Sequence, residues 1–113
     1  MANPLRGETA VTADGDTRIL VLDINALCVI EGETGLTVDR LGEALAERPS
    51  MTLIRTVFWA CLKGREPGVT IEDAGALMSA IGLAEITATL TKLFTAAMPK
   101  APKANPPKAP ATA

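Results

Sequence analysis

The sequence predicts an α+β fold, in which an N-terminal two-stranded β-hairpin precedes about five short helices in a compact, mainly α domain. Three observations predict this fold. The chain has 113 residues, a length that suits one domain. Near its start, an Asp-Gly pair separates two runs of β-prone residues. After these runs, apolar residues recur at helical spacing between capping residues and glycines.

The composition changes near the C-terminus. We expect one compact domain over residues 1–98 and a disordered tail rich in Pro, Ala and Lys over residues 99–113. The tail reads PKAPKANPPKAPATA and holds five prolines. Because proline lacks a backbone N–H group, no helix or strand ladder tolerates this density.

The hairpin is predicted from the runs GETAVTA and TRILVL, which flank Asp14-Gly15. A type I′ turn needs a positive φ at both central residues, and Asp-Gly is among the pairs that adopt it most readily. We therefore expect a two-residue loop that pairs Ala13 with Asp16.

The second strand is apolar on both faces. Side chains alternate along a strand, so Leu20 and Leu22 share one face while Ile19 and Val21 share the other. A two-stranded ribbon of this kind is marginal in water. Helices of the same chain, or another chain, must therefore cover it.

The first helix is expected within the stretch DINALCVIEGETG, residues 23–35. Asp23 or Asn25 caps the unpaired N–H groups at its start. The apolar run 26–30 forms its buried turns, and Gly32 and Gly35 allow it to end.

Four further helices are expected, over about residues 38–47, 51–63, 71–81 and 83–97. Thr37 and Ser50 cap the first two of these, and Thr70 opens a sequence that resembles a capping box. The residues expected to face the core are Val38, Leu41, Leu45, Ile54, Val57, Phe58, Cys61, Leu62, Ala74, Leu77, Met78, Ile81, Leu83, Ile86, Leu90, Leu93 and Ala97.

The residues on which most enzyme sites depend are missing. The chain contains no histidine, the commonest general base and metal ligand. It has no glycine motif for phosphates or dinucleotides. Residues 63–67 stand where an EF-hand loop would place its first oxygen ligands, and they do not supply them. We therefore expect no enzymatic activity, no cofactor and no metal ion.

Charge and cysteine usage favour a cytoplasmic protein. Residues 1–98 carry 8 basic and 13 acidic residues, and this acidic body argues against binding to nucleic acid. No signal peptide opens the chain, and no apolar run is long enough to cross a membrane. Cys28 and Cys61 fall in apolar helical runs, so we expect both to be buried and reduced.

Trp59 is the candidate contact residue for a partner. At about 100° per residue it lies roughly 120° from the centre of the apolar stripe of its helix. Trp and Arg are enriched at binding hot spots. Two interpretations remain open: Trp59 is half-buried at the edge of the core, or it contacts a partner. The candidate partner-binding residues are Trp59, Arg55, Lys63, Ile19 and Val21.

Three stretches carry a family resemblance: NPLRGETAVTADGDTRILVLDINALCVIEGETG (residues 3–35), FWACL (58–62) and TIEDAGALMSAIG (70–82). In its hairpin, its D-x-N-A-L-C junction and its late E-x-A-G-x-L helix, the chain resembles the tail assembly chaperone family of gene transfer agents and long-tailed phages. The label gene transfer agent tail tube-like protein is also attached to this group. The chain departs from the pattern at Gly32, which leaves the length of the first helix open.

The resemblance implies a small non-enzymatic factor of a bacterial prophage-like system. Such a chaperone covers apolar surface of the tail tape measure protein and helps to recruit tail tube protein. The alternative is a structural tail tube or adaptor subunit that is retained in the particle. Its partners would be those two tail proteins and possibly further copies of itself, without nucleic acid or membrane. These expectations fit an acidic chain with few candidate catalytic groups.

Overall fold

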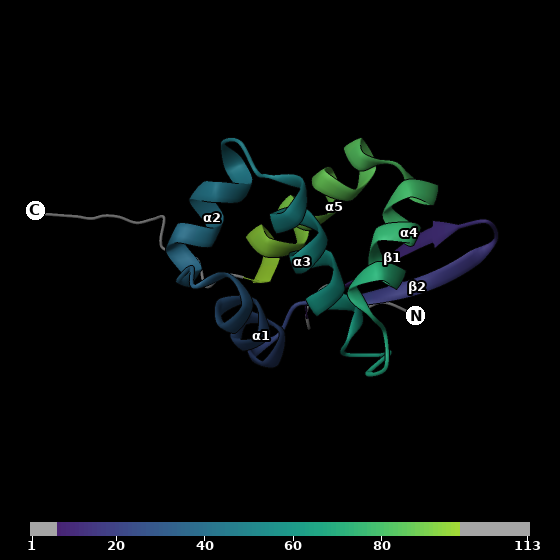
Figure 1. Cartoon of the computed structure of the whole chain (residues 1–113), viewed down its shortest axis with the longest axis horizontal. Coiled ribbons are helices and arrows are strands. Elements are labelled where there is room, and N and C mark those ends of the chain that lie inside the picture. Colours follow the sequence, from purple (N-terminus) through teal and green to yellow (C-terminus); the bar gives the residue numbers. More distant parts are fainter. Residues whose placement is uncertain (1–6, 98–113) are drawn as a thin grey trace, which may run out of the picture.

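The computed structural model describes residues 7–97, and it confirms the predicted fold class. Two antiparallel strands, β1 (Glu8–Ala13) and β2 (Asp16–Val21), form a hairpin. Five helices follow within residues 7–97 (Figure 1). The expected tail, residues 99–113, lies outside the described residues. The helices are α1 (Ile24–Thr34), α2 (Val38–Ala46), α3 (Met51–Leu62), α4 (Ile71–Ile81) and α5 (Leu83–Ala97).

The hairpin has the predicted register. Ala13 pairs with Asp16, and the two loop residues between them have positive φ, 53° at Asp14 and 83° at Gly15. Both signs are those that a type I′ turn requires. This turn sets which side chains of β2 face each side of the ribbon.

Helices of the same chain cover the ribbon. β2 packs on α3, and β1 packs on α4 and α5. Two ion pairs also tie the hairpin to the α3–α4 loop: Arg18 Nη1 lies 2.6 Å from Glu66 Oε1, and Arg65 Nη2 lies 3.1 Å from Glu8 Oε2. The two apolar faces of β2 are therefore accounted for largely within one chain.

Helix α1 begins where the sequence predicts and ends later than Gly32. The Ala26 N–H group donates a hydrogen bond to Asp23 Oδ1 at 2.9 Å, so Asp23 is the cap. The helix runs through Gly32 and ends at Thr34, followed by Gly35 with a φ of 75°. The prediction that Gly32 and Gly35 allow the helix to end is confirmed for Gly35 and wrong for Gly32, because a single glycine weakens a helix without breaking it.

The predicted caps of α3 and α4 are present. Ser50 accepts a hydrogen bond from the Leu53 N–H group, and Thr70 and Asp73 form a reciprocal capping box. Thr37 differs, because its hydroxyl donates to the Asp39 carboxylate at 2.8 Å instead of capping a backbone N–H group of α2. That hydrogen bond is the main reason that the pKa of Asp39 is lowered.

Helix α3 is the centre of the core. It packs on β2, α1, α4 and α5, which is why most of its residues are buried. Its predicted apolar stripe is confirmed at every position. The buried residues of that stripe are Ile54, Val57, Phe58, Cys61 and Leu62.

The burial of Ala97 lies outside what the structure describes, and among the other residues predicted to be buried three are exposed. Val38 and Leu83 keep 36% and 42% of their surface, because each is the first residue of its helix and lies beyond the packed turns. Cys28 is exposed because α1 buries Ala26 and Ile30. Cys28 is two residues from each of these, about 200° around the helix.

Candidate interaction surface

The large exposed apolar side chains share one position in the fold. Ile24, Val38, Met51 and Leu83 are 73%, 36%, 59% and 42% exposed, and each is the first residue of a helix. A helical side chain leans toward the N-terminus of its helix. At the first position, that direction leads past the end of the helix and away from the core. The large apolar side chains that are exposed within residues 7–97 are therefore gathered at helix starts.

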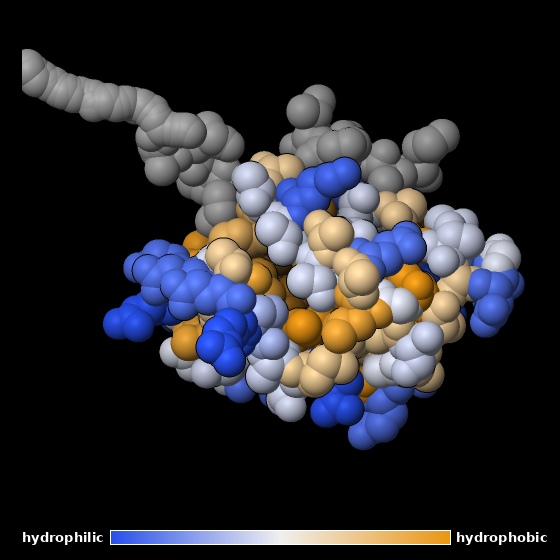
Figure 2. Space-filling view, turned by 90° about the horizontal axis from the view of Figure 1, so that it is seen from above, coloured by the Kyte–Doolittle hydropathy of each residue, from blue (hydrophilic) through white to orange (hydrophobic). Residues whose placement is uncertain are grey.

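Two of these four residues line one groove. The groove has a volume of about 360 Å³ and lies between the first turn of α3, the second half of α4 and the start of α5. Figure 2 views this side of the molecule from above and shows hydrophobic residues gathered in its hollowed middle. The lining residues are Met51, Thr52, Arg55, Gly75, Met78, Ser79, Gly82 and Leu83.

Arg55 is the charged residue of the groove. Its Nε atom is buried and has no hydrogen-bond partner among residues 7–97. The side chain lies across Gly75 of α4, where an added Cβ would stand 3.3 Å from Arg55 Cδ. No acidic side chain lines the groove. The groove therefore carries a positive charge without an acidic neighbour in its lining, and a guanidinium in this setting favours an occupant that brings a carboxylate.

Trp59 lies at the edge of the core. It is partly buried, and its indole Nε1–H group donates a hydrogen bond to the Val69 carbonyl oxygen at 3.0 Å. The Lys63 ammonium lies 5.0 Å from the ring centroid, within the range of a cation–π contact. The indole thus has an intramolecular role, in holding the α3–α4 loop. A partner contact of Trp59 stays a prediction.

The structure does not bring the five candidate partner-binding residues together. Arg55 lines the groove, whereas Trp59 and Lys63 lie beside the α3–α4 loop. Ile19 and Val21 belong to the hairpin, where Ile19 is partly buried and Val21 keeps 8% of its surface. Val21 therefore offers little area to a partner.

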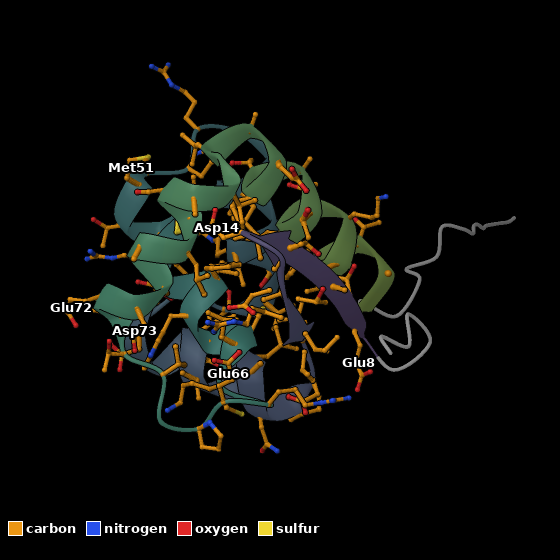
Figure 3. All side chains as sticks on the ribbon, turned by 90° about the vertical axis from the view of Figure 1, so that its right-hand side faces the viewer. Glu8, Asp14, Met51, Glu66, Glu72 and Asp73 are labelled. Atoms are coloured by element: carbon orange, nitrogen blue, oxygen red, sulfur yellow. The ribbon has the colours of Figure 1, made fainter. Side chains whose placement is uncertain are left out.

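A second hollow is acidic, and two of its four acids have intramolecular roles. It has a volume of about 650 Å³ and lies between the hairpin tip and α4. Figure 3 faces this side of the molecule and shows Asp14, Glu66 and Asp73 on it. Glu66 pairs with Arg18, and Asp73 belongs to the capping box of α4. These acids stabilise the fold and do not by themselves form a binding site.

The two cysteines differ in burial. Cys61 is fully buried, and this burial, with a smaller contribution from the charge of Asp23, raises the pKa of its thiol to about 12. Cys28 is exposed. Within residues 7–97, no group of three or more His, Cys, Asp or Glu side chains is placed to hold a metal ion.

No individual helix in the described part of the chain is both long and apolar enough to cross a membrane. Helices α4 and α5 meet those limits only when counted together, and the chain bends by 112° between them.

Residues 6–100 match the model of a family described as phage tail tube protein, GTA-gp10. The chain belongs to this family. Its resemblance to tail proteins of gene transfer agents and phages is thereby confirmed, while membership of the chaperone group in particular stays a prediction. No match was found among curated proteins or among solved structures.

For this member of the phage tail tube protein, GTA-gp10 family, sequence reasoning found Arg55 and missed the rest of the groove. Met51, Met78 and Leu83 come from three helices, and no local pattern connects them. The one available signal was their position: Met51 directly follows the capping residue Ser50, and Leu83 directly follows Gly82, so each was expected at the start of a helix.

Proposed function

We propose that this chain is a structural tail tube or adaptor subunit of a phage-like particle, that it stays in the particle, and that it acts through protein–protein contacts alone. One observation carries the proposal: the match to the phage tail tube protein, GTA-gp10 family spans residues 6–100, nearly the whole chain. A non-enzymatic role is supported by the lack of histidine and by the raised pKa of the buried Cys61 thiol.

The hairpin supports assembly by strand addition. The sheet has only two strands within residues 7–97, so the outer edge of each strand has no strand neighbour there. An unpaired edge is a template on which another chain can add a strand. In a subunit that is built into a larger particle, such an edge supplies a directional contact.

A transient tail assembly chaperone is the second candidate, and the groove favours it. Met51 and Met78 line an apolar hollow that is open at the surface. Methionine side chains adapt to varied partners, as a protein that covers apolar surface of a tape measure protein needs. Under this proposal the chain acts in the bacterial cytoplasm, recruits tail tube protein and then leaves.

Quantitative mass spectrometry of purified particles separates the two candidates. A structural subunit is expected in stoichiometric copies relative to the other tail proteins. A chain that is abundant in the producing cells but missing from the particles would overturn the structural proposal and favour the chaperone. Co-expression with the tape measure protein then tests the chaperone, which requires co-purification and a gain in the solubility of that protein.

A further inference from the structure

The most exposed large apolar residue lies between two polar ones. Ile24 is 73% exposed, and its neighbours Asp23 and Asn25 are exposed as well. We call these three residues the 23–25 knob. Asp23 caps α1 through Oδ1. A carboxylate has further lone pairs on both oxygens, so Asp23 can accept a second hydrogen bond from outside.

The 23–25 knob and the groove lie at opposite ends of α3. Asp23 and Asn25 border a hollow with Ala60 and Gly64 near the C-terminal end of α3. The groove, in contrast, is lined by the first turn of α3. Helix α3 has 12 residues, about 18 Å of helix. The figures agree, since α1 lies low in Figure 1 and Met51 stands high in Figure 3. One copy therefore cannot fill its own groove.

The two surfaces complement each other in shape and charge. The groove offers apolar walls from Met51, Met78 and Leu83, with a volume of about 360 Å³, larger than a single isoleucine side chain needs. It also holds Arg55, whose buried Nε–H group has no acceptor in the described chain. The knob presents an apolar side chain with a carboxylate one residue away.

We infer that Ile24 of one copy inserts into the groove of a second copy, where the carboxylate of Asp23 accepts hydrogen bonds from Arg55. This inference rests on the proposed role as a structural subunit. The tail of the chain is a poorer occupant, because residues 99–113 contain three lysines and no acid to meet Arg55.

The contact would join unlike surfaces of identical copies. Such contacts close into a reciprocal pair when neighbours are related by half a turn, close into larger rings at smaller rotations, or extend as open filaments. In each arrangement a copy can use both its knob and its groove. This geometry makes a specific prediction for mixtures of defective copies.

Sedimentation equilibrium of the full chain tests the inference. Ile24→Asp removes the apolar side chain of the knob, and Met51→Asp places a negative charge in the lining of the groove. Both positions are exposed first residues of helices, where an acid is favourable to the helix dipole, so both variants should fold. Val38→Asp is the matched control, since Val38 is an exposed first residue outside both surfaces.

From about 10 μM to about 1 mM, the range of weak contacts, the natural chain and Val38→Asp should rise in average mass to that of a dimer or of a larger assembly. Each of the other two variants alone should stay at 11.7 kDa. An equimolar mixture of Ile24→Asp and Met51→Asp should form a complex of two chains and nothing larger, because only one knob and one groove remain.

Four results would overturn the inference: a natural chain that stays monomeric, association of either variant alone at the natural level, equal loss in Val38→Asp, or a mixture that stays monomeric. The outcome is separable from the proposed function. A chain found in particles but monomeric in this experiment refutes the contact only, and a chain that self-associates as described but is missing from particles refutes the structural role only.

Discussion

Gly64 lies so close to Val21 that a Cβ added at position 64 would stand 3.0 Å from the Val21 Cβ. Gly64→Ala should therefore lower the free energy of unfolding by about 1–3 kcal/mol, the usual cost of overpacking. Urea denaturation followed by the fluorescence of the single tryptophan measures it. Gly32→Ala is the control: nothing lies within 4 Å of its Cβ in α1, so it should stabilise by about 0.5–1 kcal/mol. Equal effects of the two changes would contradict the close contact.

Trp59→Ala should lower the free energy of unfolding by about 2–4 kcal/mol, because the ring packs against the core and holds the α3–α4 loop. Trp59→Phe keeps much of the packing and loses the hydrogen bond to Val69, so its free energy of unfolding should fall by about 1 kcal/mol. Circular dichroism during urea denaturation measures both. If neither variant is destabilised, the indole is a surface residue and its partner-binding interpretation gains weight.

Thr70→Ala should lower the free energy of unfolding by about 1 kcal/mol. The Thr70 hydroxyl accepts a hydrogen bond from the Asp73 N–H group in the capping box of α4, and the variant loses it. Thr37→Ala should cost clearly less, because Thr37 caps no backbone N–H group of α2. Thermal unfolding of the two variants beside the natural chain compares them. A larger loss at position 37 would show that its hydrogen bond to Asp39 matters more than capping does.

One thiol of the native chain should react with iodoacetamide at pH 8, and two should react after denaturation. Cys28 is exposed, whereas Cys61 is buried and the pKa of its thiol is raised to about 12, so almost no Cys61 thiolate forms. Intact-mass measurement counts the added groups. Cys28→Ala should abolish labelling of the native chain, and labelling of that variant at the natural rate would contradict the burial of Cys61.

Alkaline pH should destabilise the chain through Cys61. The pKa of its thiol is about 12 in the folded state and near the ordinary 9.0 in the unfolded state. The unfolded chain therefore binds fewer protons between about pH 9 and pH 12, so the free energy of unfolding falls as pH rises through that window. The loss reaches at most about 4 kcal/mol at the upper end and is absent below pH 9. Urea denaturation at each pH measures the free energy of unfolding. This free energy should decline less steeply with pH in Cys61→Ala, which keeps the same lysines as the natural chain and therefore shares any effect of their titration.

The elements that follow from short-range chemistry were predictable. Asp14-Gly15 sets its turn through the positive φ that both residues adopt, and that turn alone gives the pairing of Ala13 with Asp16. The stripe of α3 was equally clear, because this helix is packed on several sides and its periodicity reports burial directly.

Burial at helix ends was not predictable in the same way. Val38 and Leu83 continue the apolar spacing of their helices, yet the core stops short of both. Periodicity gives the face of a helix but not how far along the axis its neighbours reach. The groove was missed for a related reason, because Met51 and Met78 meet only through the packing of α3 on α4.

Ile24, Val38, Met51 and Leu83 stand outside the cluster of residues that forms the core. Substitutions at these four places leave the interior intact, so at Ile24, Met51 and Leu83, which belong to the proposed contact, mutation can alter binding without first endangering the folding of the chain. Under the proposed role as a structural subunit, single amino-acid replacements at helix starts would change which components fit together, while the framework that presents those residues is inherited unchanged.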